Sequence, residues 1–111
     1  MIRTFYSMLR PTLDGIPDAP LPEGFDVRPV QPDQYRAIWE AMREAFQDLW
    51  GSTSWVDSQY SNWLEERCFS PDLWKVAWGE GQVVGMVLAR IDEEENLHKG
   101  FKRGYTEHIS V

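Results

Sequence analysis

The sequence is poor in cysteine and in basic residues, and it has no long apolar run. Cys68 is the only cysteine among 111 residues, so no disulfide can form within the chain, and we expect a protein of the reducing cytoplasm. Eleven Lys and Arg stand against eighteen Asp and Glu, a net charge of −7, which is the opposite of the cationic surface that nucleic-acid binding needs. The longest apolar stretch, residues 83–89, is too short to cross a bilayer. The composition therefore predicts neither a nucleic-acid nor a membrane partner.

Aromatic residues are abundant by contrast. Hydrophobic residues make up 42% of the chain and aromatic residues 14%, including six tryptophans. A disordered polyelectrolyte has far fewer, and each tryptophan can bury about 150–250 Å² in a core or an interface. The length fits one domain with one core.

The first two dozen residues differ in composition from the rest. Residues 1–11 mix apolar side chains with arginine and could form a short strand or a helical turn. Four prolines follow between Pro11 and Pro22, and this density disfavours helix and removes strand donors. We therefore expect residues 12–24 to be an extended linker, with the domain proper at residues 25–111.

The pattern after the linker predicts an α+β domain with a mainly antiparallel sheet. Residues 25–30 alternate as a half-buried strand does. Apolar residues then recur every three or four positions from Tyr35 to Trp50, which indicates an amphipathic helix ending at Gly51. A second helix is expected next, capped by Asp57 or Ser58 and carrying Tyr60, Trp63 and Leu64. A hairpin of residues 73–78 and 82–91 around Gly79–Gly81 follows it. The chain then continues in a mobile polar loop of residues 92–103 and a last strand of residues 105–111.

The last strand carries the most reactive side chains. Period-two geometry puts Tyr105, Glu107, Ile109 and Val111 on one face and Thr106, His108 and Ser110 on the other. A carboxylate or an imidazole on a strand that faces a cleft can accept a proton. The simpler alternative is a partly exposed strand end without chemistry. The strand also leaves an unpaired edge, from which we expect a homodimer or a strand-swapped assembly through residues 105–111 or 2–10.

Other constellations point to structure rather than to chemistry. Gly79, Gly81 and Gly85 miss the dinucleotide-binding spacing by one residue, and no helix follows them. The histidines, Cys68 and the acidic run of residues 92–95 lack metal-ligand spacing, so no metal is expected. Cys68 is expected to be a small core thiol.

Several segments resemble GNAT-type N-acetyltransferases. Leu21-Pro-Glu-Gly-Phe-Asp-Val-Arg-Pro-Val30 with Asp33-Gln-Tyr-Arg-Ala-Ile-Trp39 is similar to the first strand and helix of that family. Trp74-Lys-Val-Ala-Trp-Gly-Glu-Gly-Gln-Val-Val-Gly-Met-Val-Leu88 resembles its hairpin, and Glu107-His-Ile-Ser-Val111 resembles its fourth strand. The resemblance implies acetyl-CoA as cosubstrate, a small amine as acceptor, and the N-terminal half of the family's fold.

The same resemblance implies roles for individual residues. Backbone groups of Ile109, Ser110 and Val111 would bind the pantetheine arm of acetyl-CoA. Glu107 is the candidate base, with Tyr105 as a weaker polar contributor. Trp50 and Trp55 lie in the loop that shapes the family's acceptor pocket, although these aromatic residues could equally belong to the core.

The ends of the sequence also bear on the resemblance. Residues 1–11 and the linker are similar to the last strand of one acetyltransferase domain leading into a second, as in tandem members related to mycothiol synthase. The family's Arg/Gln-x-x-Gly-x-Gly/Ala loop, which holds the cofactor pyrophosphate at a helix N-terminus, would begin just after Val111. We therefore expect a fragment without that loop. The alternative is a non-catalytic half-domain for self-association or partner binding, and a third reading is a small α+β binding protein.

Overall fold

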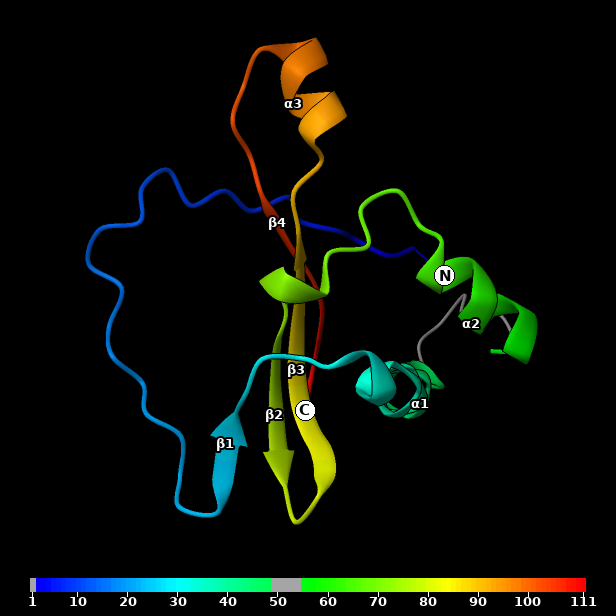
Figure 1. Ribbon diagram of the computed structural model, residues 1–111. Helices are drawn as coiled ribbons and strands as arrows, with labels where there is room; N and C mark the ends of the chain where they lie inside the picture. The colour runs from blue at the N-terminus through cyan, green and yellow to red at the C-terminus, as the bar shows by residue number, and fades with distance from the viewer. Residues whose placement is uncertain (1, 49–54) are drawn as a thin grey trace.

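The computed structural model describes residues 2–48 and 55–111, which form three α-helices and a four-stranded antiparallel open sheet (Figure 1). The elements are, in order, β1 (Phe25–Val27), α1 (Tyr35–Phe46), α2 (Asp57–Leu64), β2 (Lys75–Gly79), β3 (Gln82–Arg90), α3 (Glu93–Lys99) and β4 (Tyr105–Ser110), with short 3₁₀ turns at Pro32–Gln34 and Pro71–Leu73. The predicted α+β class is confirmed.

The sheet follows the order of the chain, β1-β2-β3-β4, and each neighbouring pair is antiparallel. Glu80 and Gly81 join β2 to β3 with φ values of +53° and +76°. Two residues of positive φ form the mirror-image turn whose twist matches that of paired strands. The predicted hairpin is confirmed, with β2 beginning two residues later than expected.

The core lies between α1, α2 and one face of the sheet, and α3 contributes no buried residue to it. The buried apolar residues of the core are Ile38, Trp39 and Met42 of α1, Trp63 of α2, Trp74, Val76 and Trp78 around β2, and Met86 and Leu88 of β3. The first three confirm the apolar stripe expected on the first helix. The Trp63 and Trp74 rings stack at 5.2 Å, so tryptophans fill much of this core.

The N-terminal region stays apart from this core. Residues 2–24 form no helix or strand, and every one of them is exposed. The polypeptide runs as a long arc from the far side of the molecule to β1 (Figure 1). The short strand or helical turn expected in residues 1–11 is therefore wrong for residues 2–11. The assignment of residues 1–11 to a preceding domain stays a prediction, as does the linker role of residues 12–24.

The expected mobile loop over residues 92–103 is wrong in its first half, because Glu93–Lys99 forms α3. Asp92 caps this helix by accepting a hydrogen bond from the Glu95 amide at 3.0 Å. Lys99 pairs with Glu95 one turn earlier at 3.1 Å. Gly100 ends the helix in the left-handed conformation, with φ of +69°. These local contacts stabilise the helix, and the three acids of its first turn, Glu93 to Glu95, interact favourably with the positive end of the helix dipole.

Two helix ends also differ from expectation. The described part of α1 ends at Phe46 and a turn at residues 47–48, while Trp50 and Gly51 lie outside the described residues. Asp57 is the first residue of α2 rather than its cap, and Val56 occupies the cap position. The Val56 amide donates to Gln59 Oε1 at 3.3 Å. No helix in the described part of the chain is long and apolar enough to span a membrane.

Candidate functional site

The outer edge of β4 is open. This strand pairs with β3 on one side, and no strand within residues 2–48 or 55–111 pairs with its other side. Backbone N–H and C=O groups alternate in direction along a strand, so about half of those in β4 point away from the sheet. The unpaired edge expected from the sequence is thus present among the described residues, and it offers main-chain donors and acceptors to a ligand or to another strand.

A bulge interrupts β4 at His108. Met86 and Leu88 are two residues apart on β3. Their partners on β4, Ser110 and Glu107, are three residues apart. The extra residue is accommodated by His108, whose φ is +47°. The expected alternation of side chains therefore holds only up to Glu107. Beyond the bulge Ile109 is 60% exposed, so it no longer shares a buried face with Glu107.

A hollow of about 320 Å³ lies beside the end of β4. Its walls are Ala41, Glu44 and Ala45 of α1, residues 82–86 of β3, and Ser110 and Val111. Gly85 lies next to this end of β4: a Cβ there would be 3.4 Å from the Ser110 carbonyl oxygen, an ordinary van der Waals distance. Two of the three residues expected to bind the cofactor therefore border a cavity, and Glu44 adds a carboxylate to it.

Arg90 links the two candidate catalytic residues. Its Nε lies 2.9 Å from Glu107 Oε2, and its guanidinium lies over the Tyr105 ring at 4.9 Å. The hydrogen-bonded pairing with Glu107 raises the pKa of Arg90 above its usual value. Arg90 Nη1 also lies 3.8 Å from the sulfur of half-buried Cys68. The Glu107 carboxylate thus already has a cationic partner in Arg90. An approaching ammonium group would share the carboxylate with that arginine.

The Tyr105 hydroxyl points to α3 instead of to open space. It donates a hydrogen bond to Glu95 Oε2 at 3.1 Å. Hydrogen bonds from Lys99 and, to a lesser degree, from Tyr105 lower the pKa of the Glu95 carboxyl. Tyr105 therefore connects β4 to α3.

The acceptor-side prediction is only partly within the described residues. Trp50 lies outside them, while Trp55 is half-buried and packs edge-on against Trp39 at 5.9 Å. Arg43 Nη1 also donates to the Trp55 carbonyl at 3.5 Å. These contacts join Trp55 to the edge of the core, which favours the structural reading of this residue.

A second and larger hollow, of about 510 Å³, lies at the other side of the sheet where β1 ends. It is lined by residues 27–30, Tyr35, Pro71, Asp72, Trp74 and Lys75. None of the predicted site residues lines it. Among the described residues, no group of three His, Cys, Asp or Glu side chains is arranged to hold a metal ion.

Sequence reasoning missed Arg90, Gly85 and Glu44 as neighbours of the site. Arg90 follows the apolar part of β3 in the sequence, but its pairing with Glu107 depends on the register across the bulge. Gly85 was visible only as a strand glycine, which often marks a close backbone approach. Glu44 falls on the polar face of α1, where a single carboxylate carries no signal of its own.

No protein-family model matches the chain, and no curated protein matches its sequence.

Proposed function

We propose that this chain is an acetyl-CoA-dependent N-acetyltransferase module of the GNAT type that acts on a small amine. The observation that carries the proposal is the open, bulged edge of β4 beside a hollow that reaches Ser110 and Val111. Bulges that free backbone groups are over-represented next to active sites, and the GNAT-like segments lead to the same strand.

The order of elements supports the proposal. A first strand, two helices, a hairpin, the short helix α3 and an edge strand follow one another here, and the GNAT-like segments fall in the same order, with α3 as an additional element before the edge strand. Fold order alone does not establish an activity. The backbone of β4 and the side chains around it therefore carry the proposal.

Backbone groups of Ile109, Ser110 and Val111 would bind the pantetheine arm. The sequence has no Arg/Gln-x-x-Gly-x-Gly/Ala loop, so the residues present account for pantetheine contacts and not for a pyrophosphate cradle. We expect binding by this chain to be weak, because the anion site at a helix N-terminus is a major contribution to holding phosphate groups.

The proposed reaction is direct transfer. The amine nitrogen attacks the thioester carbonyl, a C–N bond forms, the C–S bond breaks, and CoA leaves as a thiolate. Glu107 takes the proton of the amine at Oε1, since Oε2 faces Arg90. Backbone N–H groups freed at the bulge are the donors for the developing oxyanion. The proton passes finally to the thiolate, which gives free CoA.

The test is titration of acetyl-CoA into the chain, followed by amide NMR shifts and by calorimetry. We expect saturable shifts centred on residues 107–111. The variant Val111→Pro removes one N–H beyond the last residue of β4 and should weaken binding, whereas Val111→Ala keeps that N–H and is the matched control. Thiol release with a panel of primary amines then measures transfer, and Glu107→Gln should slow it without weakening acetyl-CoA binding.

Two outcomes would contradict the proposal. The first is the absence of shifts in β4 at saturating acetyl-CoA. The second is an equal effect of Val111→Pro and Val111→Ala on binding, which would mean that the β4 backbone does not contact the cofactor.

A further inference from the structure

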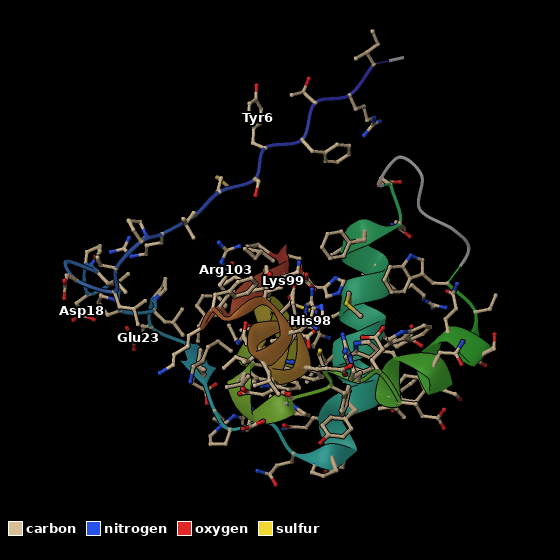
Figure 2. All side chains as sticks on the ribbon, turned by 90° about the horizontal axis from the view of Figure 1, so that it is seen from above. Tyr6, Asp18, Glu23, His98, Lys99 and Arg103 are labelled. Carbon is tan, nitrogen blue, oxygen red and sulfur yellow. The ribbon has the colours of Figure 1, made fainter. Side chains whose placement is uncertain are left out.

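The N-terminal segment, residues 2–10, exposes an unusual amount of apolar surface. Its five large apolar side chains, Ile2, Phe5, Tyr6, Met8 and Leu9, are between 72% and 96% exposed. Figure 2 shows Tyr6 on a stretch of chain that runs clear of the folded body. Exposed apolar side chains in such a run mark an interaction surface, and Ile, Phe, Tyr and Thr at this density favour strand structure.

The sheet offers one edge of matching length. β1 has three residues, and Pro29 follows shortly after its end, whereas β4 has six residues. Apolar side chains lie beside the β4 edge. Ile109 is mostly exposed on β4 itself, and the half-buried Phe46 of α1 lies near the His108 ring, with 6.1 Å between the ring centroids. A strand added here would cover part of this apolar surface.

Charge also matches between segment and edge. Arg3 and Arg10 are the only charged residues of the first ten, a net charge of +2, so the rest of the chain carries −9. The two arginines are seven residues apart, about 23 Å in an extended strand, and β4 spans about 17 Å. Glu95 lies at the Tyr105 end of β4, and Glu44 borders the hollow at the Ser110 end. Each arginine would therefore meet a carboxylate just beyond one end of β4.

We propose that residues 2–10 of one copy pair with the outer edge of β4 in a second copy, and that two copies exchange these strands reciprocally. Such an exchange pairs the open β4 edge of each copy with residues 2–10 of the other, through two symmetry-equivalent contacts. Within one copy the stretch that carries Tyr6 runs clear of the folded body (Figure 2), which favours a second copy as its partner.

The experiment measures the mass of the full chain by light scattering into the high micromolar range, with amide hydrogen exchange at the same concentrations. We expect a dimer with protected amides in residues 2–10 and 105–110. The double variant Phe5→Pro/Tyr6→Pro should abolish it, because adjacent N–H groups point in opposite directions and one of them must face the partner. The matched control, Asp18→Pro/Ala19→Pro, adds two prolines to the linker and should still dimerise.

The proline variants test pairing without unfolding the domain, since residues 2–24 are exposed and form no regular element. Arg3→Glu/Arg10→Glu should also weaken the dimer, and added salt should weaken it in the wild type. A monomer at high micromolar concentration would overturn the proposal. So would a dimer that survives Phe5→Pro/Tyr6→Pro, or a monomer whose residues 2–10 are protected, which would indicate docking within one copy.

Discussion

The bulge at His108 predicts that a glycine variant is more stable than a valine variant at this position. At an ordinary strand position the order of the two stabilities is the opposite. An L-residue in the left-handed region is strained by about 1–2 kcal/mol, and a β-branched residue is the least tolerated there. Glycine adopts this region without strain but loses about 0.5–1 kcal/mol in backbone entropy. At φ of +47°, His108→Gly should therefore be more stable than His108→Val by about 1 kcal/mol. Both variants lose the ring contact with Phe46, so that loss cancels in the comparison.

Thr106 provides the matched control. It is exposed, it pairs with Ala89 of β3, and its φ is not positive. At such a position valine is favoured over glycine by about 1 kcal/mol. Thr106→Val should thus be more stable than Thr106→Gly, the reverse of the order at His108. The two differences together amount to about 2 kcal/mol, which is well above the error of comparing variants by denaturation.

The assay is urea unfolding of the four variants and the wild type, followed by tryptophan fluorescence. The free energy of unfolding is compared at a common slope, so that only the midpoint carries the difference. If valine is favoured over glycine at both positions, His108 is an ordinary strand residue and β4 has no bulge there. That result would also remove the main support for a ligand site on this strand.

Two further predictions concern stability elsewhere in the chain. Glu80→Asn should raise the free energy of unfolding by about 1 kcal/mol, since Glu80 has a φ of +53° before Gly81 and Asn-Gly is the preferred pair for this turn. Urea denaturation measures this free energy, and an unchanged value would contradict the turn geometry. A hydrogen bond from the Glu95 amide, together with the charge of Arg67, lowers the pKa of the Asp92 carboxyl from its usual 3.8. The ionised carboxylate should therefore stabilise the fold fully above pH 3.8. This stabilisation should be lost as the pH falls through the lowered pKa. The urea midpoints of wild type and Asp92→Ala should therefore converge at low pH, and a constant gap from pH 7 down to strong acid would refute the role of the charge.

The sequence was most informative where a pattern repeats within one element. Apolar spacing located the buried face of α1, and the Gly79–Gly81 cluster located the hairpin. The α3 helix was missed because four adjacent acids resemble a solvated loop, although Asp92 followed by Glu95 is a helix-start signal. The bulge could not be predicted, because alternation assigns faces but does not show where a histidine takes a positive φ. The Arg90–Glu107 pair depends in turn on the register that this bulge sets.

The distribution of aromatic residues gives the molecule two separate optical reporters. The five tryptophans within the described residues lie on α1, on α2 or around β2, or pack against them, and β3, α3, β4 and residues 2–24 contain none. Tyr35 and Tyr60 sit among the tryptophans, whereas Tyr105 lies on β4 and Tyr6 on the N-terminal segment. The emission of these five tryptophans therefore follows the integrity of the core and changes little with events at the open edge. The solvent accessibility of Tyr6 and Tyr105 reports that edge, so unfolding and edge occupancy can be observed independently in the unlabelled protein.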